Sequence, residues 1–145
     1  MRRTQGFTLL EIMVVIVILG LLAAMVVPNL MGNKEQADRQ KVVVDIQQLE
    51  SMLDLYKMNN GFYPTTEQSL QALVTQATSE PMPRSFPDGG YIKRLPQDPW
   101  GSDYQMVSPG EMGKIDVFSA GPDRTVGTDD DIGNWNLDGK KEQQN

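Results

Sequence analysis

A long, mainly apolar run near the start of the chain, from Phe7 to Val27, constrains the fold more than any other feature. An α-helix rises about 1.5 Å per residue, so this run would form a helix about 30 Å long, the thickness of a bilayer's hydrocarbon core. Arg2 and Arg3 precede the run and favour a cytoplasmic N-terminus. We therefore expect residues 7–32 to form a transmembrane helix, with residues 33–145 as a head on the far side of the membrane.

Two properties of this run argue against an ordinary cleaved signal peptide. It is longer than the usual apolar region of such a peptide, about 7–15 residues, and it lacks a clear A-x-A cleavage site near its end. It also carries one charge, Glu11, and an unpaired carboxylate in lipid costs about 3 kcal/mol. A plain membrane anchor has no use for this carboxylate, so Glu11 is a candidate functional residue.

The segment Gly6–Glu11 reads GFTLLE, follows a short basic peptide and leads into the apolar run. It resembles the type III signal of type IV pilins and pseudopilins, which are bacterial filament subunits. The resemblance implies that a prepilin peptidase cuts between Gly6 and Phe7, which makes residues 1–6 a leader peptide, and then methylates Phe7. It also implies that Glu11 meets the N-terminal ammonium of a neighbouring subunit inside the filament. In a low-dielectric bundle, such a pair offsets the desolvation of both charges.

A second helical pattern spans residues 33–58. Apolar residues recur there at steps of 4, 3, 4 and 3, which places them on one helix face: Val42, Ile46, Leu49, Leu53 and Tyr56. We interpret this face as the surface that docks against a sheet. Pro28 predicts a kink or a locally melted stretch around residues 24–32, and Asn59-Asn60-Gly61 predicts the end of the helix.

Short β-rich segments late in the chain predict a small antiparallel sheet. Residues 104–107 and 115–119 flank the sequence SPGEMGK, which is typical of a hairpin, and a third strand is expected near 133–137. Thr65 and Gln68 are spaced as a capping box that opens a short second helix. The expected fold class is α+β, with a long N-terminal helix, half membrane segment and half amphipathic, packed on the sheet in a pilin-like arrangement.

Three further segments extend the resemblance over nearly the whole chain: residues 63–65 (YPT), 98–101 (DPWG) and 132–135 (IGNW). They resemble the protein G family, the major pseudopilins of bacterial type II secretion systems. The chain contains no cysteine, whereas major type IV pilins usually close their C-terminal region with a disulfide. This difference favours a pseudopilin over a surface pilin.

An acidic loop near the C-terminus, residues 120–135, carries the four carboxylates of Asp123, Asp129, Asp130 and Asp131. Calcium accepts six to eight oxygen ligands in irregular geometry, so two or three aspartates and backbone carbonyls of a glycine-bent loop suffice. The spacing is not that of an EF-hand. From composition alone, a solvated acidic turn is an equally good interpretation.

The family resemblance favours calcium, because protein G pseudopilins carry a calcium site in this loop. It implies side-chain ligands at Asp123, Asp130 and Asp131, with backbone carbonyls near Ala120 and Val126. Asp129 would then point outward.

The composition disfavours other classes of function. A formal net charge of -6 disfavours a broad nucleic-acid-binding face, and the absence of histidine and cysteine removes the commonest general base, metal ligand and thiol nucleophile. We therefore expect a structural subunit rather than an enzyme. The alternatives are a major type IV pilin of a surface filament and a tethered, calcium-dependent carbohydrate-active enzyme that uses a pair of the loop aspartates.

The resemblance implies a role and a set of partners. The chain would sit in the bacterial inner membrane as a single-pass protein with a periplasmic head, and then polymerise into a periplasmic pseudopilus that drives export of folded proteins across the outer membrane. Its partners would be other copies of itself, minor pseudopilins, prepilin peptidase and an inner-membrane assembly platform with a cytoplasmic ATPase.

Overall fold

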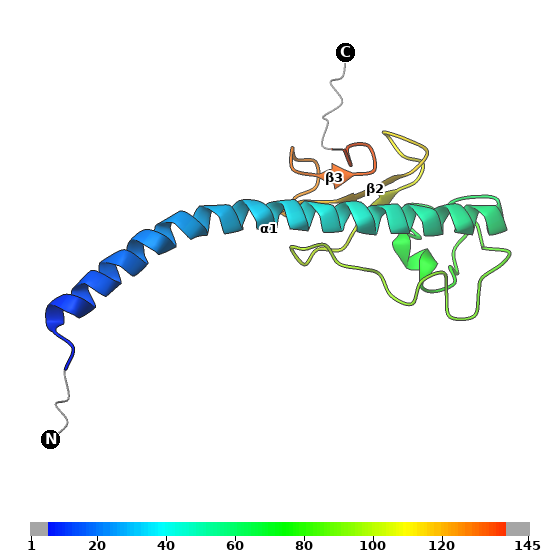
Figure 1. Cartoon of the computed structure of the whole chain (residues 1–145). Helices are drawn as coiled ribbons and strands as arrows, with labels where there is room; N and C mark the ends of the chain where they lie inside the picture. The colour runs from blue at the N-terminus through cyan, green and yellow to red at the C-terminus, as the bar shows by residue number, and fades with distance from the viewer. Residues whose placement is uncertain (1–5, 139–145) are drawn as a thin grey trace, which may run out of the picture. The chain divides into compact units, whose positions relative to one another are not determined.

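The computed structural model describes residues 6–138, apart from the side chains of residues 26–31. The chain divides into two compact units, Met1–Ala37 and Asp38–Asn145, and we call the second unit the head. The elements along the chain are α1 (Leu9–Asn60), the 3₁₀-helix η1 (Leu70–Leu73), and the strands β1 (Gln105–Val107), β2 (Asp116–Ser119) and β3 (Ile132–Gly133) (Figure 1).

Helix α1 is continuous from Leu9 to Asn60 and includes Pro28. The prediction of a locally melted stretch around residues 24–32 was therefore wrong. A proline removes one amide donor, and in a helix of 52 residues the hydrogen bonds of the turns on either side can keep the helix continuous. The predicted end is confirmed: Gly61 has φ +88°, and its amide donates to the carbonyl of Lys57 at 2.6 Å.

The predicted apolar stripe of α1 forms the centre of the head's core. Its five residues are at most 1% exposed: Val42, Ile46, Leu49, Leu53 and Tyr56. They share one apolar cluster with Leu73 of η1, Met106 of β1 and Val117 of β2. In Figure 1 the strands lie on one side of this part of α1, and η1 with its following loop lies on the other.

The sheet is antiparallel, as predicted, and its strand order is β1-β2-β3. Met106 pairs with Val117, and Phe118 pairs with Gly133. The third strand, Ile132–Gly133, is shorter than the predicted 133–137. The ladder ends at Asn134 because the Val117 amide donates to the side-chain Oδ1 of Asn134 at 3.3 Å, in place of its backbone carbonyl.

Two predicted turns are formed locally by side chains. Between β1 and β2, the Asp116 carboxylate accepts hydrogen bonds from the backbone amides of Glu111, Met112 and Gly113. The predicted capping box is also present, since Thr65 and Gln68 each bond the other's amide through their side chains. The capping box opens only a turn at residues 66–69. Ser69, with φ 52°, interrupts the helical path there and caps the separate 3₁₀-helix η1.

Candidate functional site

The N-terminal motif begins in a segment ahead of α1, residues 6–8, that is neither helix nor strand. Gly6 and Phe7 are both exposed, and a Cβ built at Gly6 would meet no atom within 4 Å. Nothing in the described part of the chain therefore requires glycine at this position. Residues 1–5 of the predicted leader peptide lie outside the described residues.

Glu11 caps the start of α1 in partnership with Thr8. The Glu11 Oε2 atom accepts from the Thr8 amide at 2.9 Å and from the Thr8 hydroxyl at 3.1 Å, and the Thr8 hydroxyl oxygen accepts from the Glu11 amide at 3.2 Å. This is a capping box, and the carboxylate lies where the helix dipole favours negative charge. Both side-chain contacts use Oε2, so within the described residues Oε1 is open to a further donor.

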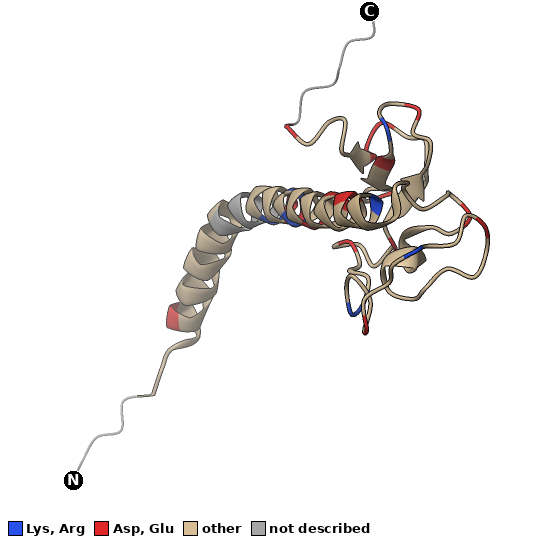
Figure 2. Cartoon of the chain, turned by 90° about the vertical axis from the view of Figure 1, so that its right-hand side faces the viewer, with Lys and Arg blue, Asp and Glu red and all other residues tan. Residues whose placement is uncertain are grey.

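The apolar side chains around Glu11 are exposed along the described first turns of α1. The exposed fraction is 81% for Leu9 and 67% for Leu21. Figure 2 shows charged residues along the head part of α1 and almost none on its N-terminal part. An apolar surface of this length needs a covering outside the monomer.

Within residues 6–25 and 32–138, no helix combines the length and the apolar character required to cross a bilayer. The transmembrane segment at residues 7–32 thus remains a prediction.

The acidic loop starts where β2 ends, and its two ends lie against each other. Gly121 has φ +68°, and a Cβ there would collide with the carbonyl oxygen of Asp130, so this position requires glycine for both its backbone angle and its close approach. The Asp123 amide donates to Oδ2 of Asp130 at 3.1 Å, which closes the loop.

The carboxylates within this loop are held by neighbouring donors. The Thr128 hydroxyl donates to Oδ1 of Asp130 at 2.6 Å, and the Gly127 amide donates to Oδ2 of Asp131 at 2.7 Å. Two hydrogen bonds lower the pKa of Asp130 below its ordinary value: the larger effect comes from the Thr128 hydroxyl and the next from the Asp123 amide. Asp130 is therefore ionised at neutral pH, as a cation ligand must be.

One oxygen in the loop fits a cation directly. Oδ1 of Asp131 is buried and has no hydrogen-bond partner among the described atoms. A buried carboxylate oxygen without a partner costs free energy, and a hard cation such as calcium would satisfy it. The remaining predicted ligands are placed differently: Ala120 is buried, Asp123 is exposed with Oδ1 turned to the Thr125 amide, and Val126 is exposed.

In this conformation the loop is not a finished metal centre. Across residues 6–138, no three or more acidic side chains are grouped closely enough to hold a metal ion. Asp123 contacts Asp130 through its backbone amide, which donates to the Asp130 carboxylate. The sequence analysis did not identify Thr128, Asn134 or Asn136, although short polar side chains within and after an acidic loop are the usual donors that orient its carboxylates.

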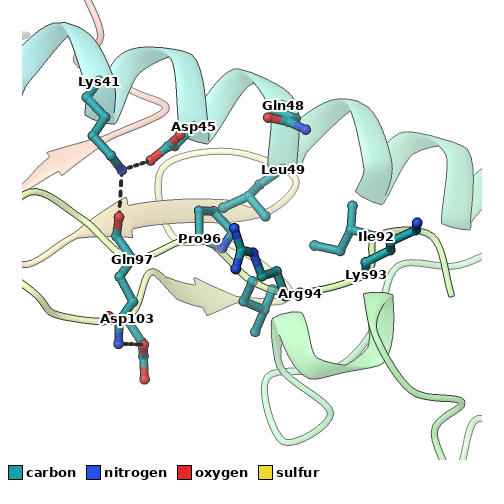
Figure 3. A pocket seen from close by; sticks show the side chains of 11 residues that line it. Lys41, Asp45, Gln48, Leu49, Ile92, Lys93, Arg94, Pro96, Gln97 and Asp103 are labelled. Atoms are coloured by element: carbon teal, nitrogen blue, oxygen red, sulfur yellow. Dashed lines mark hydrogen bonds and ion pairs between the residues drawn. The ribbon is translucent and has the colours of Figure 1, made fainter. Parts of the chain in front are cut away.

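A groove of about 850 Å³ separates α1 from the segment 92–97 of the head (Figure 3). Lys41 crosses it and donates to Oδ2 of Asp45 at 2.5 Å and to the carbonyl of Gln97 at 2.6 Å. Gln97 in turn donates to Asp103. These contacts fasten the 92–97 segment to α1, which makes the groove part of the head's framework.

Two family models together match most of the chain. Residues 29–135 match the family described as "Type II secretion system (T2SS), protein G", and residues 1–27 match the prokaryotic N-terminal methylation motif.

Several relatives are similar over nearly their full length, and each is described as type II secretion system core protein G. The Pectobacterium carotovorum protein is 69% identical over 95% of this chain and 88% of its own length. The Aeromonas hydrophila protein is 71% identical over 94% of this chain and 95% of its own length. A crystal structure of the major pseudopilin from the type 2 secretion system of enterohaemorrhagic Escherichia coli has a TM-score of 0.70 and 61% identity, covering 76% of this chain and 96% of that chain.

Proposed function

The chain belongs to the protein G family of the type II secretion system, and we propose that it enters the pseudopilus from the inner membrane, with its head in the periplasm. Its role is that of a structural subunit of the pseudopilus in protein export, and not that of a surface type IV pilin, the alternative considered from the sequence. The observation that carries this conclusion is the contiguous match of a methylation motif and a protein G head in one chain.

Residues 7–32 serve first as a single membrane span and later as part of the filament core. The exposed apolar side chains of α1 up to Met25 support this assignment, because they require either lipid or neighbouring subunits to cover them. The chain thus exchanges one apolar environment for another when it leaves the membrane and joins the filament.

Prepilin peptidase cuts between Gly6 and Phe7 and methylates Phe7. The match to the methylation motif supports this processing, as does the exposed position of Gly6 outside any helix or strand, which a protease can approach closely. Since no contact with the described residues requires glycine there, we attribute the requirement for a small residue to the enzyme.

Glu11 pairs with the N-terminal ammonium of a neighbouring subunit. In the monomer Oε2 is already held by Thr8, so the carboxylate is oriented before assembly, and Oε1 can accept the ammonium. Pre-orientation lowers the entropy cost of forming the pair.

Calcium binds in the acidic loop through Asp123, Asp130 and Asp131, with carbonyls of Ala120 and Val126 as backbone ligands. The buried, unpartnered Oδ1 of Asp131 supports this proposal, and so does the ionised Asp130. Asp123 must turn its carboxylate away from the Thr125 amide to take part. Bound calcium would neutralise the repulsion among these carboxylates and hold the end of a chain that has no disulfide.

The remaining partners follow from this role. Minor pseudopilins would cap the filament, and an assembly platform with a cytoplasmic ATPase would supply the energy. The subunit itself then needs neither a nucleotide site nor catalytic residues.

Deleting the gene in its host and restoring it tests the function. We expect exported proteins to accumulate in the periplasm without the chain and to be released when it is restored. Mass spectrometry of the membrane-extracted protein should then show an N-terminus at a methylated Phe7. Gly6→Ala should still be processed and Gly6→Val should not. Normal export in the deletion strain, or a mature protein that begins at Met1, contradicts the proposal.

A further inference from the structure

The segment that follows the acidic loop is tied back to α1 by two long-range hydrogen bonds. Nη2 of Arg39 donates to the backbone carbonyl of Asn136 at 3.0 Å. Nδ2 of Asn134 donates to Oε1 of Glu50 at 2.8 Å. Both helix residues lie within the head, so these contacts connect parts of one compact unit.

The side chain of Asn136 also fixes the backbone on both sides of Ile132. Its Oδ1 accepts from the Gly133 amide at 2.9 Å, and its Nδ2 donates to the carbonyl of Asp131 at 3.0 Å. Ile132 between them is 5% exposed and belongs to the core. Asn136 therefore determines where the Asp131 backbone sits relative to the sheet.

Asp131 stands at the meeting point of this turn and the acidic loop. Its carbonyl is held by Asn136, while its carboxylate faces the loop, with Oδ2 on the Gly127 amide and Oδ1 buried without a partner in the described structure. A shift of the Asp131 backbone would move the oxygen that best fits a cation.

From these contacts we propose that Asn136 is a positioning residue that couples cation binding in the acidic loop to the packing of α1 around Arg39. The proposal rests on the calcium site proposed above. When Asn136 holds Asp131 in place for the cation, its own carbonyl is in place to accept from the Arg39 guanidinium. The two events favour the same conformation of residues 131–136.

Linkage makes this coupling reciprocal. If the Arg39–Asn136 contact raises calcium affinity by some factor, calcium must strengthen that contact by the same factor. A bound cation would thus stabilise the contact that α1 makes through Arg39, in the first turn of the head. Arg39 and the Asn136 carbonyl that it contacts are 97 residues apart in sequence.

The experiment uses the full-length chain in detergent micelles and measures calcium affinity by calorimetry. We expect Asn136→Ala to weaken affinity about tenfold, as substitutions of residues that orient metal ligands do. Arg39→Ala, which leaves every loop residue intact, should weaken it about fivefold, the equivalent of one hydrogen bond. Asn59→Ala and Arg94→Ala are matched controls: Asn59 bonds Tyr91 at the other end of α1, and Arg94 lines the groove. Both should bind calcium like the wild type.

Hydrogen exchange provides a second readout that general destabilisation would not mimic. In the wild type, calcium should slow exchange of the amides of residues 38–46 more than those of residues 53–58, and Arg39→Ala should abolish this difference. The proposal is overturned if the wild type binds calcium while Arg39→Ala and Asn136→Ala bind it equally well, even if both melt earlier; the calcium site would then stand. If Asn136→Ala does not fold, Arg39→Ala decides alone. A wild type that binds no calcium refutes the site itself, and the coupling with it.

Discussion

The N-terminal and head parts of α1 are both rich in apolar residues, but only one part finds its partners within the chain. In the head, Ile46 and Leu53 are fully buried, whereas Leu9 and Leu21 of the first unit are mostly exposed. The head stripe has polar residues on its other faces, and the N-terminal run has almost none. The comparison teaches that a narrow apolar face is completed by one sheet, while a helix that is apolar all round requires an apolar environment.

The largest effect is expected from Glu11→Ala, which removes the one charge of the apolar run from Phe7 to Val27. We expect normal membrane insertion but almost no filaments, since removing one partner of a buried ion pair costs about 3–5 kcal/mol. Electron microscopy of filaments and an export assay measure the loss. Glu67→Ala, at an exposed position of the head, is the control. Normal filaments from Glu11→Ala contradict the proposed pairing.

Truncating one apolar side chain in each part tests the comparison directly. Leu53→Ala opens a cavity beneath the sheet and should lower the free energy of unfolding of the head by about 2–5 kcal/mol. Ile16→Ala, at an exposed position of the first unit, should change it by less than about 0.5 kcal/mol. Urea unfolding followed by tryptophan fluorescence gives both values. A comparable loss in the two variants means that residues 7–25 contribute to the core of the head.

Removing calcium sharpens the comparison, because only the head contains the acidic loop. At calcium a hundredfold above its dissociation constant, chelation should cost about 2.7 kcal/mol of stability and lower the melting temperature. Magnesium should restore little of it.

Aspartate variants then identify the calcium ligands. Asp130→Ala and Asp131→Ala should melt like the chelated wild type and ignore calcium, whereas Asp129→Ala should respond. If Asp130→Ala and the wild type melt together under both conditions, the site is refuted.

The smallest expected effect is a pH dependence confined to the head. The Tyr63 hydroxyl donates to Asp54 at 2.6 Å, and this hydrogen bond raises the pKa of Tyr63 to about 12. A raised folded-state pKa contributes stability that is complete below the unfolded value near pH 10 and is lost as the pH rises towards 12. Urea unfolding between these pH values should show the decline in the wild type and a weaker one in Tyr63→Phe. Equal slopes would show that the contact is not maintained in solution.

The sequence predicted the features that depend on periodicity or on local motifs. The stripe from Val42 to Tyr56, the end of α1 and the β1–β2 hairpin are of this kind, because each follows from neighbouring residues. Prediction from the sequence failed where the length of an element depends on the backbone conformation of one residue or on a contact with a distant part of the chain. Ser69, with its positive φ, limited the second helix to one turn, and Asn134 shortened the third strand.

For the acidic loop, the sequence could indicate the kind of ligand from the residue types but not how the side chains are oriented. Four aspartates in a short loop indicated a cation, but their orientations depend on donors elsewhere, such as Thr128 and Gly127. The bond from Arg39 to Asn136 joins positions 97 residues apart, and no local pattern in the chain marks it.

The turn between β1 and β2 is a suitable position for attaching a label that follows this protein during export. Asp116 holds the turn through backbone amides, so the side chains at positions 111 and 112 take no part in its architecture and both are exposed. Because the chain has no cysteine, Glu111→Cys would introduce a unique thiol there. A fluorophore or crosslinker attached at that thiol would report on single subunits while leaving the hairpin in register.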